Sequence, residues 1–197
     1  AAEAAKILGV ELRPLIVRKI GAPGNPEFAA GAAAEIPGSQ QVAVWWNENT
    51  LKWWKLNETW QRQQILAKKL EISEYSRKIG ISQKLKRQRQ KSGNIVLIDE
   101  GAATGGTMMA AIGAVRKIKK GLALQRKARP YQITVALPVA STEAAEMLKK
   151  NADEVVILHI DQYLGAVGAY YRKFEQVSWE KVKQLLKSSY GTNEKIN

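Results

Sequence analysis

The sequence contains no cysteine and only one histidine, His159, among its 197 residues. These absences exclude a disulfide framework, a thiol nucleophile, a thiolate metal site and a histidine-rich metal centre. We assign no chemistry to His159, because no partner at ligand or dyad spacing accompanies it. Apolar runs long enough to cross a bilayer are also absent, and the chain opens without a signal-peptide pattern. We therefore expect a cytoplasmic protein with no membrane partner.

Acidic residues are scarce relative to basic ones. Asp and Glu number 18 against 31 Lys and Arg, which leaves a formal net charge of +13. Such a charge attracts phosphate groups on small molecules, nucleic acids or membrane surfaces, and charge alone does not choose among these ligands. The length and the 45% hydrophobic content predict a single globular domain over 1–197 with a sizeable core.

The order of strand and helix signals predicts an α/β fold with a doubly wound, mainly parallel sheet. The elements expected in the C-terminal half are strands at 133–137 and 154–160, a helix at 142–150 with Thr142 as its N-cap, and a helix at 179–188 capped by Ser178. The elements expected in the N-terminal half are a helix at 1–8 closed by Gly9, a strand at 12–17, a loop at 20–26, and hairpin strands at 29–35 and 42–46.

Residues 47–93 differ in composition from the rest of the chain, and we interpret them as a helical insertion. Tryptophans cluster near its start, and ten Lys and Arg residues lie between 61 and 91 against only Glu71 and Glu74. Basic residues near aromatic ones can follow a nucleic-acid backbone and stack bases. A charge run is more commonly the solvated face of a helix, so nucleic acid is not the favoured partner. A second basic stretch, 116–129, is expected to be an exposed loop.

The stretch 94–107 carries the clearest functional signal. An apolar run over 95–98 is typical of a strand buried in a parallel sheet, and helical spacing begins at Met108. Asp99 and Glu100 lie between them, followed by small residues and three glycines. Carboxylates at the end of a strand can bind hydroxyl groups or a metal ion. Glycines allow backbone N–H groups to turn toward an anion at a helix N-terminus.

Two common phosphate-binding motifs do not fit this stretch. A P-loop needs a lysine after its last glycine, but Gly106 is followed by Thr107 and no lysine is near. A dinucleotide fingerprint needs G-x-G-x-x-G directly after the strand, whereas this turn begins with two acids and places its glycines at 101, 105 and 106. Neither motif accounts for two adjacent carboxylates, nor does a methyl-donor site.

The run Ile-Val-Leu-Ile-Asp-Glu-Gly-Ala-Ala-Thr-Gly-Gly-Thr over 95–107 resembles the signature of type I phosphoribosyltransferases. That signature is an apolar strand, two acids, a few small residues and Thr-Gly-x-Thr. The segments 17–28, 135–140 and 165–174 extend the resemblance to a subgroup whose acceptor we cannot name. The resemblance implies magnesium-dependent transfer from phosphoribosyl diphosphate to a nitrogen acceptor, with a purine-like nucleobase as one option, by an enzyme that forms a homodimer.

The resemblance also implies a role for each site residue. Asp99 and Glu100 would orient the ribose and hold Mg²⁺ indirectly, through ribose hydroxyls or water. Arg18 and Lys19 would stabilise the leaving diphosphate, and Tyr163 would contact the acceptor. The residues expected to bind the ribose 5-phosphate are Ala102, Ala103, Thr104, Gly105, Gly106 and Thr107.

The chain departs from the family pattern at three places. Glu100 stands where aspartate is more usual, a change that keeps the same hydroxyl contacts. Ala103 occupies the position of the aspartate base of hypoxanthine-guanine enzymes, so that base is absent. Type I enzymes begin with a central strand and a pyrophosphate-binding loop that do not precede Ala1, so we expect exposed strand edges and an incomplete diphosphate site.

Two alternatives to an active transferase remain open. The chain could be a regulatory protein that senses phosphoribosyl diphosphate and binds nucleic acid through the basic insertion. It could also be an inactive fragment or paralogue.

Overall fold

The computed structural model describes residues 1–79, 93–123 and 132–191. Its elements, in chain order, are α1 (Ala2–Leu8), β1 (Val17–Ala22), β2 (Asn25–Glu35), β3 (Val42–Trp46), α2 (Glu48–Trp53), α3 (Glu58–Ile79), β4 (Ile95–Ile98), α5 (Gly106–Ala123), β5 (Ile133–Ser141), α6 (Thr142–Asn151), β6 (Glu154–Asp161), the 3-10 helix η1 (Val167–Tyr170) and α7 (Trp179–Gly191). The parts of the two predicted basic stretches that fall at 80–92 and 124–129 lie outside the described residues.

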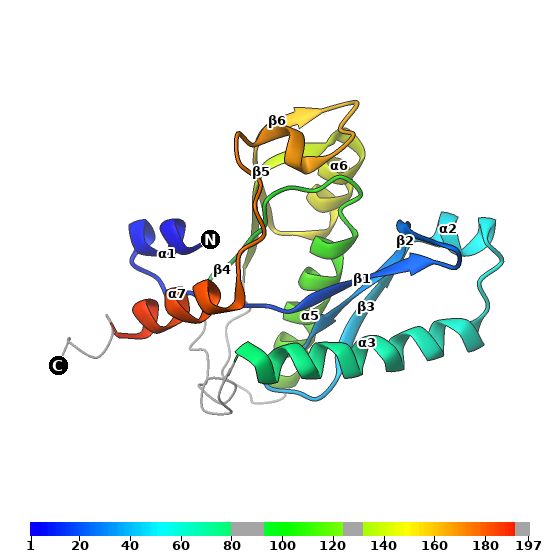
Figure 1. The fold of residues 1–197 in the computed structure, drawn as a ribbon, viewed down its shortest axis with the longest axis horizontal. Helices are drawn as coiled ribbons and strands as arrows, with labels where there is room; N and C mark the ends of the chain where they lie inside the picture. Colours follow the sequence, from blue (N-terminus) through cyan, green and yellow to red (C-terminus); the bar gives the residue numbers. More distant parts are fainter. Residues whose placement is uncertain (80–92, 124–131, 192–197) are drawn as a thin grey trace.

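The described strands form two sheets of three strands each (Figure 1). One sheet has the order β1-β2-β3 and is antiparallel, and the other has the order β4-β5-β6 and is parallel. The parallel sheet with its helices confirms the predicted α/β class. The doubly wound arrangement stays a prediction.

Helix α5 packs against both sheets, and its small residues make this possible. Met108, Ile112 and Val115 belong to a buried cluster with residues of β4, β5 and α6. Ala110 and Ala114, which are fully buried, belong to a second cluster with alanines of β2 and β3. The two faces of one helix therefore join the two sheets.

The opposite face of the antiparallel sheet is covered by α3 and α7. Ile20 of β1 packs there in a buried cluster that includes Ile72 and Ile79 of α3 and Leu186 of α7. In Figure 1, α3 runs across this sheet on the side away from α5. None of the helices in the described ranges is long and apolar enough to cross a bilayer.

Most predicted elements are confirmed. These are the helix closed by Gly9 at φ 63, the hairpin of β2 and β3, the strands β5 and β6, and the helix after Ser178, whose hydroxyl accepts a hydrogen bond from the Lys181 N–H at 3.3 Å. The N-cap prediction for α6 is wrong by one residue. Ser141, not Thr142, accepts the hydrogen bond from the Ala144 N–H.

Two predictions for the N-terminal half are wrong. The prediction that 116–129 is an exposed loop is also wrong in part. The first strand lies at 17–22 rather than 12–17, and the predicted loop at 20–26 is mostly strand. Its tight turn contains Gly24 at φ 72, a conformation that glycine adopts without strain. The stretch from Arg116 to Ala123 belongs to α5 and is not a loop.

Two glycines of α5 form a matched pair for testing how closely the helix approaches the antiparallel sheet. A Cβ atom on Gly106 would lie 2.6 Å from the Trp45 ring, whereas one on Gly113 would meet only the Ala43 Cβ at 3.8 Å. We expect Gly106→Ala to lower the free energy of unfolding by about 1–3 kcal/mol through overpacking. Gly113→Ala should raise it by up to about 1 kcal/mol, because alanine favours the helix. Urea unfolding of both variants measures the difference, and equal effects would contradict this packing.

Candidate functional site

The acidic turn after β4 is anchored to the neighbouring strand β5. The N–H of Ala102 donates to the Val139 carbonyl at 3.0 Å, and the N–H of Ser141 donates to the Ala102 carbonyl at 2.9 Å. Inside the turn, the N–H of Glu100 donates to the Asp99 carboxylate at 3.1 Å. Both carboxylates are thus presented at the carboxyl end of a parallel sheet, where α/β proteins commonly bind ligands.

The six residues expected to bind the ribose phosphate run from the end of this turn into the first two residues of α5. The hydroxyl of Ser141 donates to the Ala103 carbonyl at 2.7 Å and so fixes the middle of the segment. Gly105 adopts φ 70, and a Cβ atom there would lie 2.6 Å from Met147 Cε. Thr104 and Thr107 are exposed, so their hydroxyls are accessible to a ligand. The segment leads into the N-terminus of an 18-residue helix, which favours bound anions.

Asp99 has a strongly perturbed pKa. The pKa of Asp99 is raised from 3.8 to about 7, first by burial and then by the hydrogen bond and charge of the Glu100 side chain, which together outweigh the lowering by the Glu100 N–H. Two carboxyl groups side by side in a partly buried turn resist sharing two negative charges. A ligand that brings hydroxyl donors or a cation would stabilise the doubly ionised pair.

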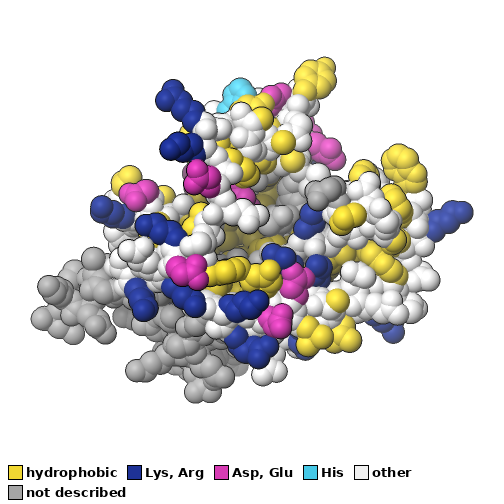
Figure 2. Space-filling model, viewed as in Figure 1, with side chains coloured by type: hydrophobic (Ala, Val, Ile, Leu, Met, Phe, Trp, Pro, Cys, Tyr) yellow, Lys and Arg dark blue, Asp and Glu magenta, His cyan; other side chains and the backbone are white. Residues whose placement is uncertain are grey.

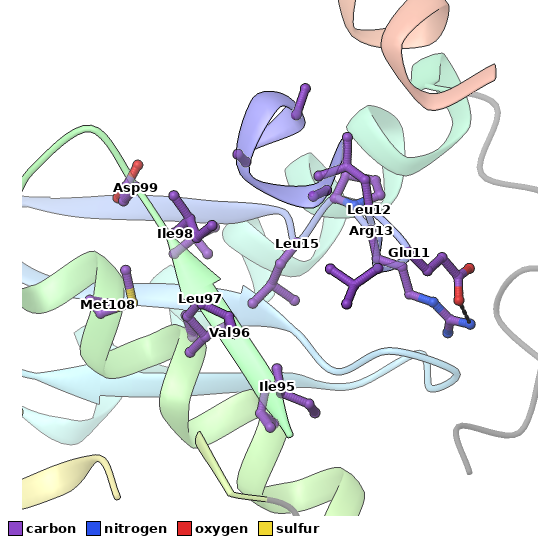
Figure 3. A pocket seen from close by; sticks show the side chains of 18 of the residues that line it. Glu11, Leu12, Arg13, Leu15, Ile95, Val96, Leu97, Ile98, Asp99 and Met108 are labelled. Carbon is purple, nitrogen blue, oxygen red and sulfur yellow. Dashed lines mark hydrogen bonds and ion pairs between the residues drawn. The ribbon is translucent and has the colours of Figure 1, made fainter. Parts of the chain in front are cut away.

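An open groove runs from this turn along the edge of β4. Among the described residues β4 is the last strand of its sheet on this side, and Val96 is 41% exposed. Figure 3 shows Leu15 opposite the side chains of β4, with Asp99 at one end of the pocket.

The two predicted cations, Arg18 and Lys19, point to opposite faces of the antiparallel sheet, because side chains alternate along a strand. Lys19 pairs with Ala32, which in turn pairs with Trp45. Trp45 contacts the first residue of α5, Gly106. Lys19 therefore lies in the cross-strand row that leads to the N-terminus of α5, on the face of the sheet that α5 covers.

Arg18 faces α3 instead, where it is held by several groups. Its Nε and Nη2 atoms both lie 2.5 Å from the Glu71 carboxylate, and its guanidinium lies 4.6 Å from the centre of the Tyr75 ring. Lys68 Nζ donates to the other oxygen of Glu71 at 2.7 Å. Burial opposes ionisation of Glu71, but the hydrogen bonds and charges of Lys68 and Arg18 outweigh it and lower the pKa of Glu71.

Tyr163 lies away from the acidic turn. It is 84% exposed, and its described hydrogen bond is from its backbone N–H to Asp161 at 2.7 Å. Tyr171 is the aromatic residue that contacts the turn, since its hydroxyl donates to the Glu100 carbonyl at 2.6 Å. Sequence reasoning missed this contact. The segment 165–174 had been noted, but no spacing rule indicates which of its aromatic side chains faces the acids.

Within the predicted basic insertion at 47–93, the described residues form mainly the helix α3, after the short helix α2. Arg62, Lys69, Arg77 and Lys78 are exposed on it, and so are Leu66 and Leu70 at 60% and 64%. Figure 2 shows Lys and Arg side chains beside apolar ones over this helix. The outer face of α3 is thus basic and partly apolar.

Comparisons with known proteins agree with the site in general terms. Two curated Mycobacterium tuberculosis proteins, from strains CDC 1551 and H37Rv, are each named "putative phosphoribosyl transferase", and each is 29% identical to the chain over 193 residues. The match covers 94% of the chain but only 38% of either relative, so the chain spans well under half the length of these relatives. No family model matches the chain.

A solved structure is also similar. The crystal structure of TT1426 from Thermus thermophilus is 34% identical in sequence and superposes with a TM-score of 0.65. The similarity covers 95% of the chain and 80% of the Thermus chain. At this identity and coverage, the chain belongs to the same protein family as TT1426.

The raised pKa of Asp99 predicts a pH-dependent cost to folding. Below about pH 4 the carboxyl is protonated in the folded and unfolded states alike, and the cost of burying its charge is absent. As the pH rises from 3.8 to about 7, only the unfolded state ionises readily, so stability is lost. The stability of Asp99→Asn relative to the wild type should therefore rise over this range and level off above it.

Urea unfolding of the ligand-free protein at several pH values measures this difference. Glu146→Gln is the control, because Glu146 is an exposed carboxylate on α6. A difference between Asp99→Asn and wild type that stays constant from pH 4 to pH 8 would contradict the raised pKa.

The ion pair between Arg18 and Glu71 predicts the opposite pH dependence. Because the pKa of Glu71 is lowered, its contribution to stability is present above pH 4.5 and is lost as the pH falls further. Glu71→Gln should lower the free energy of unfolding by about 1–2 kcal/mol at neutral pH, with the effect shrinking in acid. Glu74→Gln, on the exposed face of the same helix, is the control. An equal effect of both substitutions at pH 7 would rule out a special role for Glu71.

Proposed function

We propose that this chain carries out magnesium-dependent transfer of a phosphoribosyl group from phosphoribosyl diphosphate to a nitrogen acceptor, as a single-domain enzyme of the type I phosphoribosyltransferase fold. One observation carries the proposal. Adjacent carboxylates, a glycine-containing turn and a helix N-terminus follow one another in the chain at the carboxyl end of a parallel sheet. The names of the curated relatives support the same class of reaction.

The acidic turn suits the ribose of the substrate. Ionised Asp99 and Glu100 accept hydrogen bonds from the vicinal ribose hydroxyls, and these charge-assisted bonds are stronger than neutral ones. The segment from Ala102 to Thr107 offers backbone N–H groups and two exposed hydroxyls to the 5-phosphate. Binding at both ends of the ribose holds C1 in a fixed orientation for attack.

Magnesium fits the donor set of the turn. Mg²⁺ prefers oxygen ligands in an octahedral arrangement, and in phosphate-binding sites it commonly takes one or two carboxylates together with substrate oxygens and water. No group of three or more candidate ligands occurs among the described residues. Asp99 and Glu100 would therefore hold the ion with the ribose hydroxyls or water. Bound Mg²⁺ would neutralise charge on the leaving diphosphate.

The transition state resembles the oxocarbenium ion of glycoside chemistry, because the bond from C1 to the diphosphate breaks as the acceptor nitrogen approaches. Lys19, in the cross-strand row that leads to α5, would stabilise the departing diphosphate, and its position on that face of the sheet supports this role. Arg18 could share this role only by changing its contact with Glu71. The carboxylates and cations thus act mainly through electrostatics.

The acceptor is a nitrogen nucleophile, with a purine-like nucleobase as one candidate. Ala103 supplies no base, so proton removal must fall to another group or to an acceptor that is already deprotonated. We also propose that the protein acts in the cytoplasm as a homodimer.

The exposed face of α3 favours a second candidate function. Its cations and leucines are not used by the transferase site. A catalytically weak protein that senses phosphoribosyl diphosphate could use this basic face to bind nucleic acid. Ligand binding without turnover, together with salt-sensitive nucleic-acid binding, would identify this function.

Titration calorimetry with magnesium and phosphoribosyl diphosphate tests the proposed function. The full chain should bind the ligand, and Asp99→Asn combined with Glu100→Gln should weaken binding by roughly 10- to 100-fold, because charged hydrogen bonds are lost. Glu146→Gln should bind like the wild type.

Turnover is tested in the same solution by adding pooled nucleobases and amines and measuring pyrophosphate release. The absence of any binding by the wild-type chain would refute both the transferase and the sensor.

A further inference from the structure

The segment after β6 returns across the acidic turn and contacts it through Tyr171. The Tyr171 hydroxyl donates to the Glu100 carbonyl oxygen at 2.6 Å. This carbonyl belongs to the peptide group between Glu100 and Gly101, at the exit of the carboxylate pair. The adjacent Tyr170 behaves differently, because its hydroxyl donates to Asp161 and does not reach the turn.

Close packing fixes the segment on the turn. A Cβ atom on Gly101 would lie 2.7 Å from Val167 Cγ1 and 2.9 Å from Val139 Cγ1, so Val167 presses directly on the turn. The Phe174 ring lies against Gly168 and has its centre 5.3 Å from that of Tyr171. Val167 and Tyr171 therefore contact the turn from the same partly exposed segment, so two side chains hold that segment against it.

The hydroxyl of Tyr171 also keeps its proton. Burial raises the pKa of Tyr171, and the charges of Glu100 and Asp99 raise it further. The group is a hydrogen-bond donor throughout the neutral range. Its partner is a main-chain carbonyl, so both carboxylates of the pair stay available to a ligand.

The orientation of this peptide group matters for the site. An uncompensated change in the ψ angle of Glu100, which turns this carbonyl, would change the direction of the Glu100 side chain relative to the segment that follows. Ala102 and Ser141 fix the far end of the turn through their backbone hydrogen bonds. At the near end, the described hydrogen bond to the Glu100 carbonyl comes from Tyr171.

We propose that Tyr171 is a positioning residue for the carboxylate pair. By holding the Glu100 carbonyl it orients Asp99 and Glu100 toward the ribose hydroxyls without touching the substrate itself. The proposal rests on the proposed function, since it concerns the same ribose-binding turn. The predicted acceptor contact of Tyr163 is a different role and is not affected.

The experiment compares Tyr171→Phe with Tyr170→Phe in the full chain. Three probes are titrated in the presence of magnesium: phosphoribosyl diphosphate, ribose 5-phosphate and inorganic phosphate. The first two carry ribose hydroxyls and a phosphate, and the third carries the phosphate alone. We expect Tyr171→Phe to weaken both ribose ligands by roughly 3- to 10-fold, the usual effect of one lost hydrogen bond. Inorganic phosphate should bind Tyr171→Phe and wild type equally, and Tyr170→Phe should match wild type for all three probes.

A measurement without ligand tests the contact directly. The Gly101 N–H belongs to the same peptide group as the Glu100 carbonyl. Its amide hydrogen exchange, followed by NMR, should quicken in Tyr171→Phe and stay unchanged in Tyr170→Phe.

The outcomes separate this inference from the proposed function. If wild type binds the ribose ligands and Tyr171→Phe binds them equally well, Tyr171 has no positioning role and the proposed function stands. An equal loss for all three probes would make Tyr171 a general support of the fold and would overturn the inference. If wild type binds none of the probes, the proposed function fails, and the positioning role fails with it. Unchanged Gly101 exchange in Tyr171→Phe would overturn the contact itself, whatever the binding results.

Discussion

The packing of α5 against two sheets is the constraint on which the site depends. The sheets share no strand in the described residues, and one helix joins them. Ala110 and Ala114 let one face of α5 approach the antiparallel sheet, while Met108 and Ile112 bury the other face against the parallel sheet. The N-terminus of α5 follows the acidic turn in the chain, so both sheets together decide where that turn lies.

This arrangement gives the two neighbouring cations, Lys19 and Arg18, different surroundings. Lys19 and Arg18 are neighbours in sequence, yet strand alternation places Lys19 in the cross-strand row that leads to Trp45 and Gly106, and Arg18 against Glu71 of α3. Only Lys19 is on the sheet face that α5 covers. Arg18 holds α3 against the sheet through its ion pair with Glu71, which is partly shielded from water. Helix α3 is therefore part of the structure that supports the site.

Prediction from sequence succeeded where local signals and tertiary contacts agree. The acidic turn, β5, α6 and β6 each combine a strong periodic pattern with short connections, and their boundaries differ from the expected ones by only a few residues. It failed around 12–26, where glycine and proline indicated a loop. There Gly21 lies so close to Pro26 that a Cβ atom would come within 2.5 Å, and pairing with β2 makes the segment a strand despite its composition. The intrinsic preference of these residues for a loop does not take into account that they can pair with β2.

The sequence alone determined the order of elements in the central stretch, which is a strand, two carboxylates, a glycine turn and a helix. These residues are contiguous, and local backbone preferences suffice to place them in that order. The predicted burial of the strand is wrong, because β4 lies at the edge of its sheet in the described part of the chain, with Val96 exposed. Only the tertiary structure decided which distant side chains meet the turn. It placed Lys19 in the row leading to Gly106, turned Arg18 toward Glu71, and brought Tyr171 to Glu100. Such contacts depend on strand register and on the packing of segments that are far apart in the sequence. Tyr171 and Glu100, for example, are 71 residues apart.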